Sequence, residues 1–452
     1  MICILEMINS FIWGVPALLL ILAVGIYLSV RTNFVQIRLF PKAMKSFFSK
    51  FLAKNKVSDG ISSRQALFTA LAATVGTGNL AGVAGAIAIG GPGAIFWMWI
   101  CAFLGMVTKF AEATLAVRYR EKNNFGEWIG GPMYMIRNGL SRKWLPVASV
   151  YCFLGTVAAF GVGNATQINT VIGGINSTIV AYGGEESSLL NLIIGIFLAI
   201  LIGMILLGGA KRIGRIAEKL VPFAAVIYII LCVFILVVKV NEIPRAIEAI
   251  VSGVFKPNAV TGGVLGSAFT ALRVGASRGV FTNEAGMGTA AIAHASARVH
   301  HPVEQGLMGI VEVFLDTIVI CTLTALVILC SGIRIPYGAD IGVALTSEAF
   351  SSFYGDWVNV VITIALSLFA IATILGWGLY GARCAQYLFG KSAWKIFAYC
   401  QMAVVIVGAL LKTETVWLMS EIMNGLMAVP NLLALIWLTP ELCYLLKEYK
   451  ST

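Results

Sequence analysis

Charge is scarce in this sequence, and its scarcity excludes an ordinary soluble fold. Asp, Glu, Lys and Arg make up 12% of the 452 residues, whereas they make up about a quarter of a typical soluble domain. Hydrophobic residues make up 59%, and the mean hydropathy is +0.90. A soluble chain cannot bury so much apolar surface, so the composition predicts a protein surrounded by lipid.

Catalytic and metal-binding motifs are also missing. The sequence has no HExxH and no GxSxG motif, and its nine cysteines are isolated, with no CxxC pair. Most cysteines lie in apolar runs, where they behave as small hydrophobic residues. His294, His300 and His301 lie at or beyond the inner end of a run, where a solvated loop is expected. We therefore expect no enzyme, no disulfide framework and no transition-metal site.

Apolar runs long enough to cross a membrane occur about eleven times. A hydrocarbon core of ~30 Å needs about 20 helical residues, and the ten-residue alternation of barrel strands is absent. The sequence thus predicts an all-α membrane protein of about 11 transmembrane helices, in one domain over residues 1–452. The runs lie near residues 11–30, 66–89, 93–117, 145–173, 189–208, 220–238, 259–293, 305–330, 356–384, 394–411 and 416–446.

The basic residues predict how these spans are oriented. If the N-terminus lies outside, 24 of the 32 Lys and Arg residues fall in cytoplasmic loops and five in outer loops. The positive-inside rule then predicts a cell-membrane protein with an outer N-terminus and a cytoplasmic C-terminus. The net charge of +11 follows from this topology, so nucleic acid is not an expected partner. No basic residue precedes the first run and no cleavage site follows it, so we expect a retained span.

Two spans carry glycine-rich interruptions that contain polar residues. They read TVGTGNLAG over residues 74–82 and VGASRGVFTNEAGMGTA over residues 274–290. With the first span (11–30) set aside as an extra helix, they are numbers one and six of ten. Paired breaks at matching positions are typical of an inverted-repeat transporter with its site near the bilayer midplane. The two expected five-helix halves are residues 66–238 and 259–446.

An unwound stretch of helix can bind ions. It frees N–H groups at the start of one half-helix, which suit a carboxylate, and carbonyls at the end of the other. Carbonyls suit sodium, a hard cation that prefers oxygen ligands. Gly76, Gly78 and Gly286 give conformational freedom and let a ligand approach the backbone. The alternative is that these glycines serve only close helix packing, but Thr77 and Asn79 among them favour a binding site.

Uncharged polar residues inside other spans are further candidates. Gln167 lies well inside the fourth span, where an amide is costly unless it is paired, and bonding to a neighbouring helix is the alternative to binding a ligand. Thr373 and Trp377 are four residues apart and share a helical face. The Thr373 hydroxyl suits a cation site. Trp377 suits the wall of a pocket, with a membrane-interface position as the alternative.

Charged residues within spans are candidates for function by default. Our hypothesis is a cytoplasmic gate of paired charges, because the predicted topology places all of them nearer the cytoplasmic side. A static ion-pair network that holds helices together is the alternative. The gate candidates are Arg278, Glu284, Glu312 and Asp316, with Lys109 and Glu112 on the third span.

Four segments resemble one known family. GGPGAIFWMWICAFLG, residues 90–105, resembles the signature of the alanine or glycine:cation symporter family, also called the sodium:alanine symporters. TALAATVGTGNLAGVAGAI (69–87), GVFTNEAGMGTAAIAHA (279–295) and FAIATILGWGLYGARC (369–384) resemble its other hallmark segments, and the likeness spans about residues 11–445. The resemblance implies a leucine-transporter-like fold, with an extra N-terminal helix before five-plus-five inverted repeats.

The resemblance also implies two sets of binding residues. The substrate set would meet the charged ends of an amino acid, hydrogen-bond it and line a small apolar pocket. It comprises Thr77, Gly78, Asn79, Gln167, Phe281, Thr282 and Trp377. The cation set would combine carbonyls at the first break with the ninth span. It comprises Ala73, Gly76, Ala370 and Thr373.

The predicted function is secondary active symport of small neutral amino acids. The resemblance implies import of alanine or glycine coupled to sodium, and sometimes to protons, with no cofactor besides the coupling ion. Membrane lipid is an expected partner, and the oligomeric state is left open. A channel or a transporter-like amino acid sensor are the alternatives. A channel would show pore-lining rings repeated by symmetry, and a sensor usually carries an added soluble domain.

Overall fold

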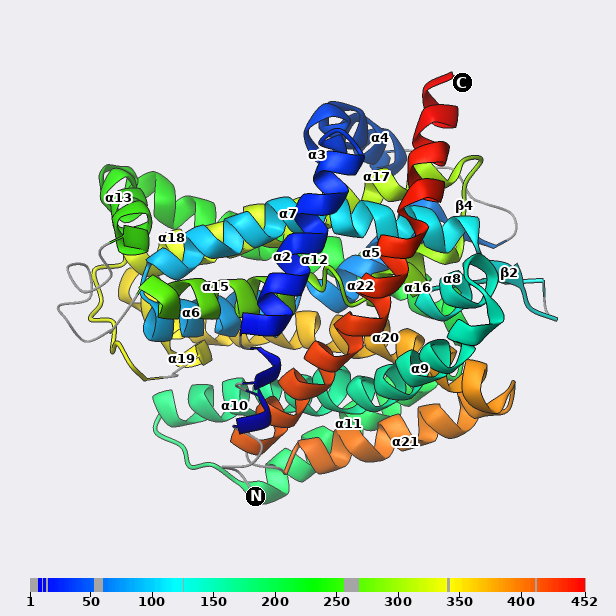
Figure 1. Ribbon diagram of the computed structural model, residues 1–452. Coiled ribbons are helices and arrows are strands. Elements are labelled where there is room, and N and C mark those ends of the chain that lie inside the picture. The colour runs from blue at the N-terminus through cyan, green and yellow to red at the C-terminus, as the bar shows by residue number, and fades with distance from the viewer. Residues whose placement is uncertain are drawn as a thin grey trace.

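The protein is a bundle of long helices, as its computed structural model shows (Figure 1). The structure describes residues 7–9, 11–13, 15–52, 60–124, 126–255, 268–339, 342–410 and 413–451. Within these ranges seven helices are long and apolar enough to cross a membrane, and one bent pair forms an eighth span. Two shorter apolar helices, Pro16–Arg31 and Ala393–Gly408, accompany them. The all-helical membrane architecture thus agrees with the prediction from sequence.

The first half of the chain contains both long spans and short connecting elements. In order they are α2 (Val15–Arg31), α3 (Val35–Arg38), α4 (Phe40–Leu52), β1 (Ile61–Ser62), α5 (Ser63–Thr74), the π-helix η1 (Gly78–Gly82), α6 (Val83–Gly90), α7 (Gly93–Arg118), β2 (Glu121–Lys122), β3 (Trp128–Ile129), α8 (Pro132–Gly139), η2 (Arg142–Trp144), α9 (Leu145–Phe160), the π-helix η3 (Gly161–Ala165), α10 (Thr166–Ala181), α11 (Ser188–Leu206) and α12 (Gly209–Val238).

The second half repeats this mixture. In order it contains η4 (Val240–Glu242), α13 (Ile243–Phe255), α15 (Ala268–Asn283), α16 (Thr289–Ala295), β4 (Ala297–Arg298), α17 (Pro302–Val313), the π-helix η5 (Phe314–Cys321), α18 (Thr322–Cys330), α19 (Gly342–Tyr354), α20 (Val358–Phe389), α21 (Ala393–Gly408) and α22 (Thr413–Ser451). The predicted span over 259–293 is described from residue 268 onward, and its first part lies outside the described residues.

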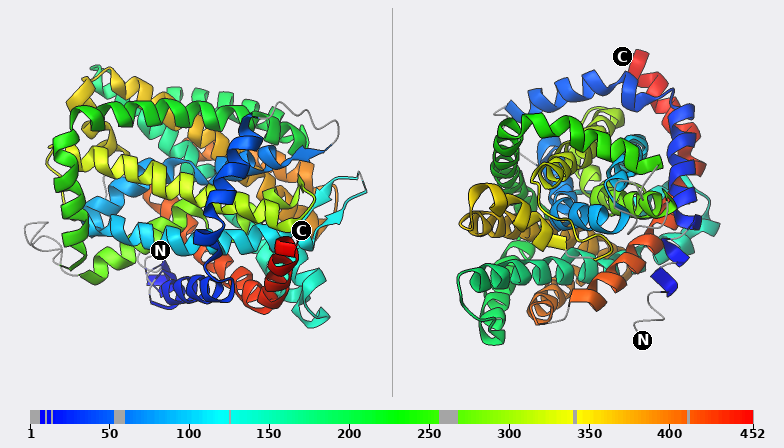
Figure 2. Two further views of the ribbon diagram at one scale, coloured as in Figure 1. Left: turned by 90° about the horizontal axis from the view of Figure 1, so that it is seen from above. Right: turned by 90° about the vertical axis from the view of Figure 1, so that its left-hand side faces the viewer.

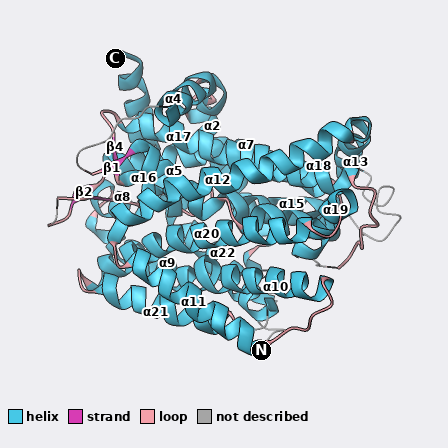
Figure 3. Cartoon of the chain, turned by 180° about the vertical axis from the view of Figure 1, so that it is seen from behind, coloured by secondary structure: helices cyan, strands magenta, loops and turns pink. Residues whose placement is uncertain are grey.

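The two broken spans lie side by side, and each half pairs with its counterpart. Helix α5 packs against α16, and α6 packs against α15. Strand β1 leads directly into α5 and pairs in parallel with β4, which follows α16. Both strand pairs lie at one end of the bundle, the strand end, whereas α13 and α19 lie at the other, the α13 end (Figures 1 and 3). Hence α5 and α16 face the strand end, and α6 and α15 face the α13 end.

Local sequence explains where these half-helices begin and end. Ser62 and Gln65 form a capping box at the start of α5, with bonds of 3.0 and 3.1 Å. The helix ends where Val75 adopts an extended backbone, and the next helical segment is bent by 49° from it. After α15, Gly286 and Gly288 have φ of 97° and 75°. This left-handed backbone favours glycine, so the helix cannot continue there.

Helices α2 and α22 run together along one side of the bundle (Figure 2). Helix α2 also packs against α7. Helix α2 therefore packs against both an early and a late part of the bundle rather than standing apart in the lipid.

Among the helices that occupy stretches where loops were expected, the longest are α4, α13 and α19. Each has 13 residues, too few to cross a membrane, so a search for apolar spans passes over them. Helix α13 is amphipathic and buries Ile250 and Gly253, and it packs against α7.

The crossing of α15 and α7 provides a test of this packing. A Cβ added to Gly275 would lie 2.2 Å from the Ala94 carbonyl oxygen and 2.8 Å from Trp97 Cβ, so the helices approach closely at a small residue. We expect Gly275→Val to destabilise the protein by about 1–3 kcal/mol or more through overpacking. Thermal unfolding of the detergent-solubilised protein measures this effect.

The matched control for this variant is Gly173→Val. Gly173 is exposed on α10 and a Cβ there would meet nothing within 4 Å. The control should unfold close to the native temperature. Equal stability of the two variants would contradict the close crossing.

Candidate functional site

The first break, between α5 and η1, brings three predicted residues together. The Gly76 N–H donates to Asn79 Oδ1 at 2.8 Å. The Thr77 hydroxyl donates to Gln167 Oε1 at 3.1 Å, and the Gln167 amide donates to the Val162 carbonyl in η3 at 3.1 Å. Thr77, Asn79 and Gln167 are all buried. Gln167 therefore joins the unwound backbone of one span to the π-helix of another.

Helix α20 approaches the same break with a hydroxyl group. A Cβ on Gly76 would lie 2.6 Å from Thr373 Oγ1 and 3.7 Å from Gln167 Oε1. Thr373 Oγ1 is buried and has no hydrogen-bond partner among the described residues. One turn along α20, a Cβ on Gly376 would lie 2.9 Å from the Ala73 nitrogen. The last turn of α5, the break and Thr373 thus form one group, and Ala370 is buried one turn before Thr373.

Helix α15 closes against the start of η1. A Cβ on Gly78 would lie 3.4 Å from Thr282 Oγ1 and 3.6 Å from Phe281 Cδ1. The Thr282 hydroxyl donates to the Arg278 carbonyl at 2.7 Å. Phe281 and Thr282 therefore lie against the first break, next to Gly78, which belongs to the same predicted substrate set.

The second break is fixed by a buried acidic residue in a left-handed backbone. Glu284 has φ of 54°, which is uncommon for a residue with a side chain. Its Oε1 accepts a bond from the Trp377 indole nitrogen at 2.7 Å, and its Oε2 accepts one from the Thr289 hydroxyl at 2.5 Å. Trp377 is fully buried, so the membrane-interface alternative for it is wrong.

Two residues outside the break satisfy its backbone. Glu112 Oε1 accepts from the N–H groups of Gly286 and Gly288 at 2.9 and 3.0 Å. The Asn431 amide donates to the same oxygen at 2.6 Å and to the Gly286 carbonyl at 2.8 Å. From the sequence, Glu112 is predicted only as a gate charge, and Asn431 is not predicted at all. The signal for both was a polar residue in an apolar span.

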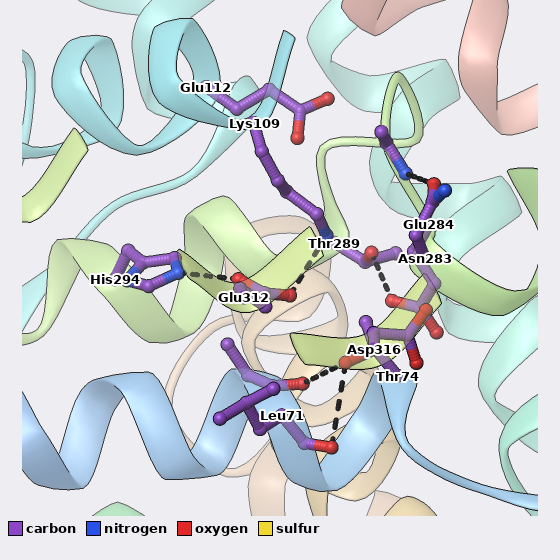
Figure 4. A network of polar contacts seen from close by, with 12 residues as sticks. Leu71, Thr74, Lys109, Glu112, Asn283, Glu284, Thr289, His294, Glu312 and Asp316 are labelled. Carbon is purple, nitrogen blue, oxygen red and sulfur yellow. Dashed lines mark hydrogen bonds and ion pairs between the residues drawn. The ribbon is translucent and has the colours of Figure 1, made fainter. Parts of the chain in front are cut away.

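A chain of buried polar groups leads from the breaks toward the strand end, and Figure 4 shows its part from Lys109 through Glu312 to His294. Lys109 Nζ lies 3.2 Å from Glu312 Oε1, and Glu312 Oε2 accepts from His294 Nε2 at 2.8 Å. His294 Nδ1 lies 2.7 Å from Gln305 Nε2, and Gln305 Oε1 accepts from the Ser63 hydroxyl at 2.6 Å. Since an amide nitrogen only donates, Gln305 Nε2 donates to His294 Nδ1, and the Nε2 side of the ring faces Glu312.

The expectation of a solvated His294 is wrong. Its side chain is fully buried, and it joins α16 to α17. Sequence alone missed this because the acidic partner, Glu312, lies 18 residues away on another helix. The chain ends near the surface, where Lys50 Nζ donates to Ser63 Oγ at 3.2 Å. Burial lowers the pKa of Lys50, and the Glu304 carboxylate opposes that shift.

The four gate candidates do not form a single group. Arg278 lies within α15, on the opposite side of the breaks from Glu312, and its Nη1 lies 2.7 Å from Glu421 Oε1 on α22. Glu421 also accepts from the Asn9 amide at 2.7 Å. Arg278 therefore lies apart from the ion pair of Glu312, and a cytoplasmic gate of these charges stays a prediction.

Asp316 belongs to the first break rather than to either ion pair. Its Oδ1 accepts from the Asn79 amide at 2.7 Å, and its Oδ2 accepts from the Thr317 hydroxyl at 2.7 Å. Asn283 in turn donates to Thr317 at 3.3 Å. Since Asn79 contacts both Gly76 and Asp316 in this structure, its amide positions the unwound backbone.

The fold defines the class of protein. The chain resembles the crystal structure of MhsT in complex with L-phenylalanine, with a TM-score of 0.57 over 84% of this chain and 97% of that chain, at 14% sequence identity. This likeness shows that the chain has the leucine-transporter-like fold.

The chain belongs to the sodium:alanine symporter family, whose model matches residues 1–452. The sodium/alanine symporter AgcS of Methanococcus maripaludis is 43% identical over 96% of this chain and 93% of its own length. The probable sodium/glutamine symporter GlnT of Bacillus subtilis is 37% identical over 98% and 89%. An uncharacterized transporter of Haemophilus influenzae is 42% identical over 99% and 95%. The protein is therefore a cation-coupled amino acid transporter, and not an enzyme.

The buried ion pair predicts a large effect of removing one partner. Lys109 and Glu312 are both fully buried, so Lys109→Met leaves a carboxylate without its cation and should destabilise the protein by about 3–5 kcal/mol. Adding Glu312→Gln removes the unpaired charge and should restore most of that loss. A double-mutant cycle of unfolding free energies in detergent measures both effects.

The exposed pair Arg245–Glu242, at 3.2 Å, provides the control for this cycle. Arg245→Met should cost less than about 1 kcal/mol because solvent screens the charges. A Lys109→Met variant as stable as this control would show that the buried pair contributes no stability.

Proposed function

We propose that the protein imports small neutral amino acids, such as alanine or glycine, together with sodium by alternating access. The single observation that carries the proposal is the buried Thr373 hydroxyl, which has no partner among the described residues and faces the break at Gly76. An oxygen atom oriented toward an unwound helix end is what a sodium site requires. The names of the sodium/alanine and sodium/glutamine relatives support the same coupling.

In this proposal the cation lies between the end of α5 and α20. The carbonyls of Ala73, Gly76 and Ala370 and the hydroxyl of Thr373 are its oxygen ligands. The last carbonyls of a helix have no intrahelical donors, and the negative end of the α5 dipole points at the same place. The approach of Gly376 to Ala73 brings α20 close enough for the two elements to share one ion.

The amino acid binds beside the ion. Its carboxylate meets the N–H groups at the start of η1, around Thr77 and Gly78, because a helix N-terminus favours an anion. Gln167 hydrogen-bonds the substrate and Phe281 covers it. Thr282 packs against Gly78, and Trp377 hydrogen-bonds Glu284. Thr282 and Trp377 therefore shape the pocket indirectly, by positioning Gly78 and Glu284.

Alternating access requires closing contacts on both sides of the site. The Arg278–Glu421 pair serves the outer side, and the chain from Lys109 to Ser63 serves the cytoplasmic side, with the N-terminus outside and the C-terminus inside. Transport is coupled because each ligand binds the occluded state better than the open states and thereby favours the other. A channel or a sensor needs no such reciprocal dependence.

Uptake into proteoliposomes tests the proposal directly. An inward sodium gradient should drive saturable accumulation of labelled alanine or glycine, and replacing sodium with choline should abolish it. A proton gradient imposed without sodium measures proton coupling separately. Equal uptake with and without any cation gradient would refute symport, and non-saturable flux would indicate a channel.

Thr373 provides a residue-level test of the ion site. Thr373→Ala removes the proposed hydroxyl ligand and should raise the sodium concentration for half-maximal uptake at least tenfold, since losing a bond to a charged group costs about 1.5–3 kcal/mol. Thr373→Ser keeps the hydroxyl and should remain within about threefold of the native protein. Equal sodium dependence of both variants would place the ion elsewhere.

A further inference from the structure

Helix α4 exposes basic and apolar side chains on two neighbouring flanks. Lys42, Lys45 and Ser49 are exposed and lie three and four residues apart, so they share one flank. Phe48 and Leu52 are 53% and 76% exposed and share the flank beside it. Basic and large apolar side chains exposed side by side are typical of a helix that lies in a membrane interface.

The opposite face of α4 holds this helix to the bundle. Ala43 is fully buried, α4 packs against α17, and the Phe40 and Phe314 rings are 4.9 Å apart. Figures 1 and 2 show α4 at the outer edge of the bundle, where it runs across the direction of α7. The two exposed flanks therefore face away from the protein, toward the surrounding membrane.

The basic residues of this region have no acidic partners. Residues 7–58 contain no Asp or Glu. Within the described part of the chain, no acidic side chain forms an ion pair with Arg31, Arg38, Lys42 or Lys45. In contrast, Arg118 at the end of α7 pairs with Glu441 at 2.7 Å. The unpaired positive charge favours an anion from outside the protein, and the exposed apolar flank favours a lipid over a soluble anion.

The last turn of α4 is bonded to the first turn of α5. Lys50 Nζ donates to Ser63 Oγ at 3.2 Å, and Arg64 Nη1 donates to the Phe51 carbonyl at 3.1 Å. The Phe51 and Phe68 ring centroids are 6.0 Å apart. Helix α5 has 12 residues and ends at the first break. Because so short a helix moves as one body, a contact that fixes α4 also restrains the end of α5 at the break.

We propose that α4 binds the headgroups of anionic phospholipids and thereby holds α5 in the arrangement that binds the cation. The ammonium groups of Lys42 and Lys45 donate to phosphate oxygens, while Phe48 and Leu52 enter the acyl region beneath the headgroups. In the proposed orientation these lipids belong to the cytoplasmic leaflet. The lipid contact stands by itself, whereas its effect on the cation site rests on the proposed function.

Thermal unfolding of the detergent-solubilised protein tests the lipid contact. Phosphatidylglycerol should raise the unfolding temperature more than phosphatidylcholine does, because a ligand of the native state stabilises it. In the double variant Lys42→Gln with Lys45→Gln, the phosphatidylglycerol concentration for half-maximal stabilisation should rise at least about tenfold, since each basic residue near an anionic surface contributes about fivefold in affinity.

Two further double variants serve as controls for this measurement. Lys42→Arg with Lys45→Arg keeps both charges and should respond to phosphatidylglycerol as the native protein does. Arg142→Gln with Lys143→Gln removes two exposed basic residues from η2, which equals the change of charge in α4, and should also leave the response unchanged. An equal loss in the α4 and η2 glutamine variants would overturn the proposal, because it would indicate diffuse attraction by net charge.

Sodium-driven alanine uptake in proteoliposomes tests the effect on the cation site. The sodium concentration for half-maximal uptake should be about fivefold lower in equal parts of phosphatidylglycerol and phosphatidylcholine than in phosphatidylcholine alone. This difference should disappear in Lys42→Gln with Lys45→Gln. Lys50→Met, which removes the bond to Ser63 but neither exposed lysine, should keep the stabilisation by phosphatidylglycerol and lose the lipid dependence of uptake.

Two other results would overturn the inference. One is equal stabilisation of the native protein by both lipids. The other is a lipid dependence of uptake that persists in the Lys42 and Lys45 glutamine variant, which would indicate only that an anionic vesicle surface accumulates sodium. If phosphatidylglycerol stabilises the protein through α4 but no vesicle shows sodium-driven uptake, the proposed function fails while the lipid contact stands.

Discussion

Backbone groups that leave a helix inside a membrane need protein partners, because lipid offers none. The second break frees the N–H groups of Gly286 and Gly288, and a single carboxylate oxygen of Glu112 accepts both. Asn431 bonds to that oxygen and to the Gly286 carbonyl. At the first break Asn79 accepts from the Gly76 N–H and is held by Asp316. The breaks can exist in lipid because polar side chains from α7, α22, η1 and η5 hydrogen-bond the free backbone groups or hold the residues that do.

Hydrogen bonding around the breaks also explains why so many acidic residues are buried. Glu284 has two donors and Glu112 has three, whereas Glu312 has Lys109 and His294. Each carboxylate therefore accepts bonds that a protonated acid would make less well. The charges belong to the architecture of the breaks as much as to any gate. The two interpretations of the sequence, a gate and a static network, are thus not mutually exclusive, since a contact that holds a half-helix also limits its movement.

The sequence was informative wherever the signal is local. Glycines among polar residues located both breaks, since helix interruption depends on neighbouring residues, and hydropathy located the long helices. The sequence did not predict the partners of Lys109, His294 and Arg278, because each partner lies on a different helix that is distant along the chain. Helices α4, α13 and α19 were missed for a different reason: each has 13 residues, too few to carry a 20-residue apolar run. Tertiary contacts, rather than composition, determine where such helices and ion pairs form.

The segment that precedes α2 is held in place by Glu421, the residue that also pairs with Arg278. Asn9 donates to Glu421 Oε2, Trp13 donates to the Glu421 carbonyl at 2.8 Å, and Arg278 contacts Oε1. The first two contacts hold the start of the chain to α22, whereas the third crosses to α15. If α15 moves away from α22, the Arg278 contact has to break, whereas Asn9 keeps Glu421 oriented for its return. The N-terminal segment thereby pre-organises a contact between α15 and α22, which lowers the entropic cost of forming that contact.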